Sequence, residues 1–378
     1  MSVVVVEEVG SLWAALGGVR DHRRCAGRRY PLRGLLLVAV AAMLAGRRDQ
    51  LGIVRWGRQL RPEALASLGI SRGRVPAPSV WCELFQELDV GSLEAVLGAW
   101  VRGGRPAGHI AMDGKRLRGS ATATAPGAHL LAAFSDALGG VVGQLQVPPD
   151  SNEITAALDL LRALPLEGSV VTGDAIFAQK EICRVIRDGG GDYFFTVKDN
   201  QPALKADIAL AFGGFSPSAA RLPPDLTCAE TVGKEHGRLE TRTLQATASL
   251  AAYLGPAWPG VAQVCRITRR RLVRGQESVE TVYAITSLPP GRANAADLLA
   301  LSRSHWGIEN RLHHVRDVTC REDQCRTRAR AAPQVLAAMR NTVLTIIRRS
   351  GRKPVEGFEH YAEHRSEALN DATSVRTE

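Results

Sequence analysis

Hydrophobic positions in the first hundred residues recur at helical spacing. The clearest stripe would place apolar side chains on one helix face at Leu32, Leu35, Leu36, Ala39 and Met43. Pro31 precedes this run and Gly46 follows it, and these residue types suit a helix start and a helix stop. Further stripes run through Trp56 and Leu84. The pattern predicts an all-helical N-terminal domain over residues 1–102.

The pattern changes after a stretch rich in Gly, Arg and Pro at residues 103–108. Short apolar runs then predict strands. Between the later strands, apolar residues at helical spacing predict helices. The expected strands are 109–113, 130–135, 141–147, 169–172 and 193–197, and the expected helices begin at a capping box of Asp150 and Glu153 and at Gln179. Three strands, a helix, a strand, a helix and a strand form the order of a ribonuclease H-like core. We therefore expect an α/β fold with a mixed sheet flanked by helices.

Beyond this core, alternating polar and apolar stretches such as Gln263 to Arg269 and Glu280 to Ile285 predict a β-rich insertion over 204–292. Asn294 and Asp297 then cap a long helix whose apolar side includes Ile308 and Leu312. A second amphipathic helix follows, and the last residues are polar. The expected divisions are 1–102 (helical, Arg-rich), 103–203 (first part of the catalytic domain), 204–292 (insertion), 293–350 (C-terminal helices of the catalytic domain) and 351–378 (tail).

Three carboxylates occupy positions where packing alone does not explain them. Asp113 and Asp174 each end an apolar strand, and Asp is a poor strand former that is costly to bury. Glu309 follows Ile308 by one residue, about 100° around a helix, at the rim of the core. Two acidic strand ends and an acidic helix are the layout that holds two Mg²⁺ ions against a phosphodiester. We predict that all three are catalytic and metal-binding, with Mn²⁺ able to substitute.

Charge favours a polyanionic partner. The net charge is +10, and residues 1–75 hold 13 Arg against five acidic residues. The N-terminal domain is therefore either a DNA-binding or a packing domain. No apolar run is long enough to cross a bilayer and no basic signal region opens the chain, so we expect a cytoplasmic protein without a membrane partner. Seven cysteines, without a Cys-x-x-Cys pair, fit a reduced compartment.

Basic side chains near the three carboxylates are candidate DNA contacts. They are Lys115, Arg116, Arg118, Lys198, Arg238, Arg303 and Arg316. Arg316 lies seven residues after Glu309 on the same helix face, so it either binds phosphate or pairs with that carboxylate. For Lys198 and Arg238, a solvated turn and a plain hairpin are the alternatives.

A zinc site is a rival interpretation of the same helix. His305, Glu309 and His313 are spaced four residues apart, and Cys320 follows. The spacing differs from the His-Glu-x-x-His pattern of metalloproteases, and a zinc site leaves Asp113 and Asp174 without a role.

Motifs in order along the chain carry a family resemblance. The most specific is Arg303-Ser-His-Trp-Gly-Ile-Glu-Asn310, followed by Leu312-His313, Asp317-Val318 and Glu322-Asp323. Shorter ones are Asp21-x-Arg23, Tyr30-Pro-Leu32, Pro78-Ser79, Asp113-Gly-Lys115, Ser151-Asn-Glu-Ile154, Asp174-Ala, Gln179-Lys-Glu-Ile182, Lys198-x-Asn-Gln201, His236-Gly-Arg238 and Ile285-Thr-Ser-Leu288. Together they resemble DDE transposases of the H-repeat-associated insertion-sequence type.

The resemblance implies a bacterial, nucleoid-associated enzyme that cleaves and joins insertion-sequence ends by two-metal-ion phosphodiester transfer. Asp113, Asp174 and Glu309 would be its catalytic triad. Its partners would be double-stranded DNA with terminal inverted repeats and target DNA, and it would act as a homo-oligomer. The alternatives are a decayed transposase that only binds DNA, and a metal-dependent nuclease.

Overall fold

The computed structural model divides the chain into two compact units, which we describe separately. Unit 1 comprises residues Met1–Arg105, Gly114–Asp150 and Glu309–Glu378, and unit 2 comprises Pro106–Asp113 and Ser151–Ile308. The residues described are 10–25, 28–213, 223–235 and 237–373. None of the helices within these ranges is long and apolar enough to cross a membrane.

Unit 1 is built mainly of helices around one apolar core. Its elements are α1 (Leu12–Leu16), α2 (Leu32–Leu44), α3 (Gln50–Gly57), α4 (Pro62–Ser67), α5 (Pro78–Glu87), α6 (Val90–Arg102), η2 (Arg118–Ser120), β2 (His129–Ser135), β3 (Gly140–Gln146), η4 (Ile308–His313), α12 (His314–Val318), η5 (Glu322–Gln324), α13 (Ala332–Arg349), α14 (Pro354–Glu363) and α15 (Arg365–Thr373). Helix α2 is buried on nearly all sides, which its sequence allows because Arg33 is its only charged residue.

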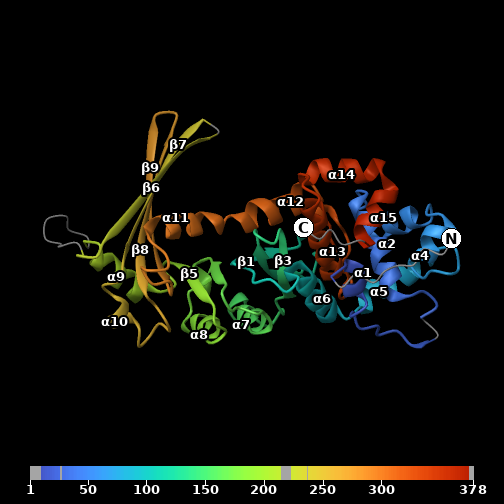
Figure 1. Ribbon diagram of the computed structural model, residues 1–378, viewed down its shortest axis with the longest axis horizontal. Coiled ribbons are helices and arrows are strands. Elements are labelled where there is room, and N and C mark those ends of the chain that lie inside the picture. Colours follow the sequence, from blue (N-terminus) through green and yellow to red (C-terminus); the bar gives the residue numbers. More distant parts are fainter. Residues whose placement is uncertain (1–9, 26–27, 214–222, 236, 374–378) are drawn as a thin grey trace. The chain divides into compact units, whose positions relative to one another are not determined.

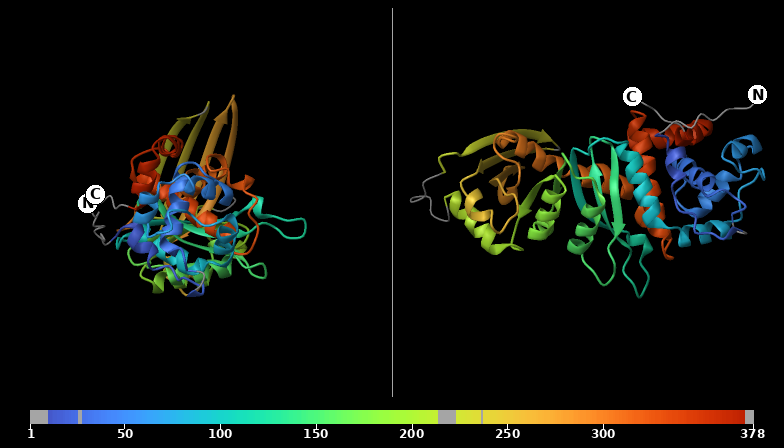
Figure 2. Two further views of the ribbon diagram at one scale, coloured as in Figure 1. Left: turned by 90° about the vertical axis from the view of Figure 1, so that its right-hand side faces the viewer. Right: turned by 60° about the horizontal axis from the view of Figure 1, so that its bottom comes forward.

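N-terminal and C-terminal helices of unit 1 share that core. Apolar side chains of α1 to α6 and of α13 to α15 form one continuous buried cluster. Helix α13 also lies beside β3 and α6 (Figure 2). Segments from opposite ends of the sequence therefore stabilise one another in this unit.

Unit 2 alternates strands and helices before a run of antiparallel strands. Its elements are the start of β1 (His109–Arg116), α7 (Glu153–Ala163), β4 (Val170–Gly173), η3 (Ala175–Phe177), α8 (Lys180–Asp188), β5 (Asp192–Val197), α9 (Pro202–Ala211), β6 (Thr227–Glu235), β7 (Arg238–Thr247), α10 (Ala251–Leu254), β8 (Gln263–Val273), β9 (Gln276–Thr286) and α11 (Ala295–Ser304). The long β8–β9 hairpin turns at Arg274 and Gly275, both at positive φ, which matches the twist of the flanking strands.

The strands form one sheet in the order β3-β2-β1-β4-β5-β9-β8-β7-β6 (Figure 1). Strands β1, β4 and β5 are parallel, whereas β2–β3 and all pairs from β5 to β6 are antiparallel. The β-rich insertion thus extends the sheet, because β9 pairs directly with β5. This mixed sheet with flanking helices confirms the ribonuclease H-like α/β fold expected from the sequence.

Two local predictions were wrong. Helix α7 begins two residues later than expected: its cap is Asn152, whose side chain accepts from the Thr155 amide, so no box of Asp150 and Glu153 forms. The long helix capped by Asn294 does form its capping box, but it does not continue as a uniform α-helix. It changes to the π-helical turn η4 at Ile308–His313.

Candidate active site

Asp113 and Asp174 stand at equivalent positions of neighbouring strands in unit 2. Strands β1 and β4 are parallel, and their register pairs Met112 with Gly173. Asp113 directly follows Met112, and Asp174 directly follows Gly173. The backbone of Asp174 is still extended. Neighbouring strands lie about 4.8 Å apart. Asp174 follows the carboxyl end of β4, whereas Asp113 lies within β1, which continues to Arg116, so the strand expected to end at Asp113 is longer than predicted. Both aspartates nevertheless lie at the same level of the sheet, directly after the last β1–β4 pair.

A row of polar groups leads to Asp174 within unit 2. The Oδ1 atom of Asp174 lies 3.8 Å from Nε2 of His305. On its other side, Nδ1 of His305 lies 3.1 Å from the Thr172 hydroxyl, and His109 Nε2 lies 2.7 Å from the same hydroxyl. His305 lowers the pKa of the Asp174 carboxyl against the opposing effect of burial. Asp174 is therefore ionised at neutral pH.

Two amides hold the turn that follows Asp174. The Asn200 side chain donates to the carbonyl of Ala175 at 2.5 Å, and Gln201 donates to that of Ala178 at 3.0 Å. Both residues lie just after the end of β5. The sequence motif of Lys198 to Gln201 thus has a structural task, because it fastens the segment that presents Asp174.

Glu309 lies on the π-helical turn, and His313 partners it. A π-helical turn has wider spacing than an α-helix and is frequent at functional sites. The Nδ1 atom of His313 lies 3.3 Å from Oε2 of Glu309, and His313 is almost fully buried. This imidazole lowers the pKa of the Glu309 carboxyl, which is ionised at neutral pH.

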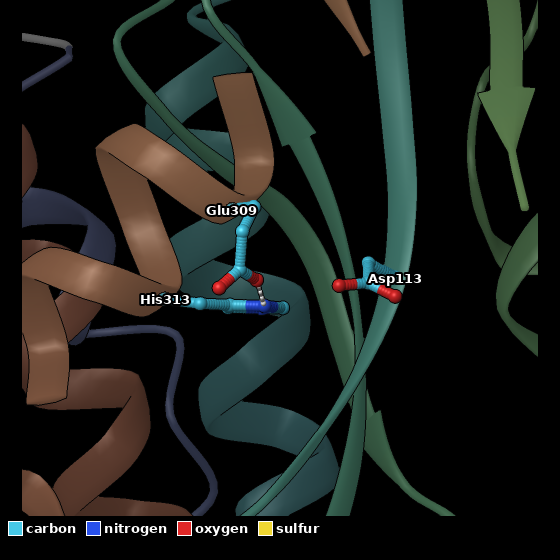
Figure 3. A group of neighbouring side chains, drawn as sticks. All are labelled: Asp113, Glu309 and His313. Atoms are coloured by element: carbon cyan, nitrogen blue, oxygen red, sulfur yellow. Dashed lines mark ion pairs between the residues drawn. The ribbon is translucent and has the colours of Figure 1, made fainter. Parts of the chain in front are cut away.

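The structure brings Asp113, Glu309 and His313 together. One ligand atom from each lies within 4.8 Å of the others, and among the described residues these three form the one such group of His, Cys, Asp and Glu. Figure 3 shows a carboxylate oxygen of Asp113 pointing from β1 toward the Glu309–His313 pair. Asp174 is not a member of this group. The two carboxylates supply the oxygen ligands that Mg²⁺ and Mn²⁺ prefer, while Nδ1 of His313 pairs with Glu309.

The rival zinc set does not assemble. His305 faces Asp174 and Thr172, whereas His313 faces Glu309, and neither His305 nor Cys320 joins the group above. The sequence therefore singled out both histidines, but for a different task. Thr172 and His109 were missed. The available signal was spacing, because Thr172 precedes Asp174 by two residues and shares its side of an extended chain.

Two of the predicted DNA contacts are buried ion-pair partners in unit 1. Arg316 is fully buried, and its guanidinium binds both carboxylate oxygens of Glu322 at 2.8 and 3.0 Å. Lys115 is nearly buried and lies 2.5 Å from Asp317. Both cations therefore pair with acidic side chains inside unit 1, and neither is among the exposed candidates. Arg316 pairs with Glu322 rather than Glu309.

The remaining unit 1 candidates lie near the end of β1. Arg116 is exposed and donates to the Gly127 carbonyl at 3.3 Å. Arg118 is largely exposed, with its Nε 3.8 Å from Asp323. Both remain available to an external phosphate.

The unit 2 candidates belong to a cationic face of the sheet. Glu240 on β7 is nearly buried and lies within 3.8 Å of four guanidiniums, those of Arg238, Arg242, Arg269 and Arg271. Burial lowers the pKa of Arg242, and the nearby charge of Arg303 lowers it further. The hydrogen bond from Arg269 lowers the pKa of Glu280, and Lys198 adds a smaller effect of the same sign. Lys198, Arg238 and Arg303 are all exposed. His236 lies outside the described residues.

Comparison with known proteins identifies the class of this chain. Residues 104–346 match the family described as Transposase DDE domain, and residues 13–101 match the DDE_Tnp_1-associated family. The chain belongs to the DDE transposase family. This confirms the family resemblance seen in its motifs and implies the use of divalent metal.

Individual proteins and one solved structure are also similar to this chain. The chain is 33% identical to an "Uncharacterized protein in dhlA 3'region" of Xanthobacter autotrophicus, over 71% of this chain and 92% of the relative. It is 26% identical to the "H repeat-associated putative transposase YhhI" of Escherichia coli K12, over 90% and 91% of the two chains. A structure titled as a piggyBac transposase synaptic complex with hairpin DNA aligns with a TM-score of 0.41 and 11% identity, over 97% of this chain and 78% of that chain.

Proposed function

We propose that this protein is a DNA transposase that cleaves and joins insertion-sequence ends with Mg²⁺, which Mn²⁺ can replace. The observation that carries the proposal is the placement of the carboxylates. Asp113 and Asp174 each come directly after the last pair of residues that joins the neighbouring parallel strands β1 and β4, and ligand atoms of Asp113 and Glu309 lie within 4.8 Å of each other. We propose that these three carboxylates hold two ions. Bound there, the ions would activate a hydroxyl nucleophile and stabilise the leaving oxygen.

The chain's own residues would orient the site. His313 and His305 lower the pKa values of Glu309 and Asp174, and Asn200 and Gln201 hold the turn after Asp174. Arg116, Arg118, Lys198, Arg238 and Arg303 would bind phosphates of double-stranded DNA that carries terminal inverted repeats, and of target DNA. A net charge of +10 supports such a partner. We further propose action as a homo-oligomer on DNA.

A plasmid assay tests this function. Purified protein is incubated with a supercoiled plasmid carrying the DNA that flanks its gene, together with a target plasmid. We expect nicking at the element ends with Mg²⁺, none with EDTA, and covalently joined products. Nicking without joining would identify a metal-dependent nuclease. Binding without any nicking would identify a decayed transposase.

Replacing Thr172 by Val is expected to lower the cleavage rate by roughly tenfold to a hundredfold, the range for residues that orient metal ligands. Valine keeps the shape but removes the hydroxyl that contacts His305 and His109. Mn²⁺ affinity, measured by electron paramagnetic resonance, should weaken in parallel, and Thr172→Ser should restore both. If Thr172→Val binds Mn²⁺ like the wild type, Thr172 has no positioning role.

A further inference from the structure

A large cavity in unit 1 has six arginines in its lining. Its volume is about 1160 Å³, and it lies among the connections between α1 and α2, α3 and α4, and α4 and α5. The exposed arginines that line it are Arg24, Arg29, Arg58, Arg72 and Arg74.

Two other arginines of the same segment, Arg23 and Arg28, bind groups of the protein itself. Arg23 binds both carboxylate oxygens of Asp21 at 2.9 Å and donates to the Tyr30 carbonyl. Arg28 donates to the backbone carbonyls of Arg23 and Asp21. These two arginines close the connection between α1 and α2. By contrast, no ion pair involves the five exposed cavity arginines within the part of the chain that the structure describes.

The acidic lining does not balance this charge. Glu83 and Glu87 of α5 are the two acidic lining residues, against six arginines including Arg23. Glu87 already pairs with Arg330. Like charges held close together repel, so this concave surface is suited to an external polyanion.

A second arginine-lined cavity lies on another face of α5, also within unit 1. It has a volume of about 490 Å³, and Gln86 of α5 lines it. Its arginines, all exposed, are Arg48, Arg321, Arg326 and Arg328. A helix with its side chains is about 10–12 Å wide, and one DNA strand carries a phosphate every 3.4 Å along the axis. A strand crossing α5 would therefore present about three phosphates to the two cavities.

We propose that these two groups of exposed arginines, which we call the α5 arginine tract, bind the sugar–phosphate backbone of DNA. The tract shares no residue with the candidate active site. Arg is suited to this task because its planar guanidinium binds phosphate oxygens in pairs. The inference rests on DNA as the substrate of the proposed function, but not on the catalytic carboxylates.

The test compares two double variants. Arg72→Gln with Arg74→Gln removes two tract charges, and Arg162→Gln with Arg184→Gln removes two exposed charges on α7 and α8 as the control. Affinity is measured by fluorescence anisotropy from 50 to 200 mM salt, on duplexes with and without the element end. The tract variant should bind both duplexes roughly tenfold to a hundredfold more weakly at 0.1 M salt, with a salt slope about two units shallower. The control should match the wild type.

Two results would overturn the proposal. One is that the affinity and the salt slope of the tract variant equal those of the wild type, and the other is that affinity is lost only for the duplex with the element end. Thermal unfolding should be unchanged in the tract variant. If that variant does not fold, Arg24→Gln with Arg29→Gln replaces it. The Asp113→Asn variant should bind DNA with the affinity of the wild type. If the wild-type protein binds DNA but does not cleave it, the proposed function is rejected and the proposal for the tract still stands.

Discussion

Single replacements Asp113→Asn, Asp174→Asn and Glu309→Gln should each lower the rate of strand cleavage roughly a thousandfold or more. Each change keeps the size of the side chain but replaces a charged metal ligand by a neutral amide. The lowered pKa values of Asp174 and Glu309 mean that a full negative charge is lost at neutral pH. Single-turnover nicking of the end-containing plasmid measures the effect.

Two controls separate chemistry from binding and folding. DNA affinity of the three variants should equal that of the wild type, because the proposed phosphate contacts are elsewhere. Asp199→Asn provides the matched change, since Asp199 also follows a strand end, is exposed and pairs with Lys205. It should cleave normally. Near-normal cleavage by any of the three variants would remove that residue from the triad.

Glu322→Gln should lower the free energy of unfolding by about 3–5 kcal/mol at pH 7. Burial alone would raise the pKa of Glu322, but Arg316 and Arg340 together lower it to about 2. Because the folded-state pKa lies below the unfolded one, this stabilisation is complete above about pH 4.5 and is lost as the pH falls toward 2. The Gln variant leaves two buried guanidiniums without a counter-charge. The midpoint of urea unfolding reports the loss.

The same change should also reduce cleavage, because the Glu322 network anchors the segment that carries Glu309. Arg316 contacts Gln144 of β3 at 3.4 Å, and Arg340 of α13 donates to the Arg48 carbonyl at 3.0 Å. The exposed Glu363→Gln should change the stability by no more than about 0.5 kcal/mol. Equal unfolding midpoints for the two variants would show that the network does not stabilise the fold.

Much of the fold was readable from local pattern. The strands that carry Asp113 and Asp174, the alternating strands of the insertion and the Asn294–Asp297 cap all follow from periodicity and capping chemistry. The π-helical turn at Glu309 could not be predicted. The spacing of apolar residues does not show that backbone hydrogen bonds here join residues five apart rather than four. The cap of α7 was misplaced by two residues, since Asp150 and Asn152 are both good caps.

Basic residues show the limit most clearly. Arg303 and Arg316 flank Glu309 in one predicted helix, yet Arg303 is exposed and Arg316 is fully buried. Arg316 is buried because it pairs with Glu322, six residues further along the chain. Glu322 lies on the next helical turn, η5, after α12 has ended. Likewise, Arg23 and Arg24 are adjacent, but only Arg23 is used to close its connection.

The chain by itself determined its family, its strand and helix order, and the carboxylates that chemistry needs. These are encoded locally, in side-chain periodicity and in motifs a few residues long. Only the tertiary structure decided which cations face solvent, that His305 and His313 each partner a different carboxylate, and that distant arginines line one cavity. Such outcomes depend on which segments meet after folding, and burial and pairing energies arise only from those meetings.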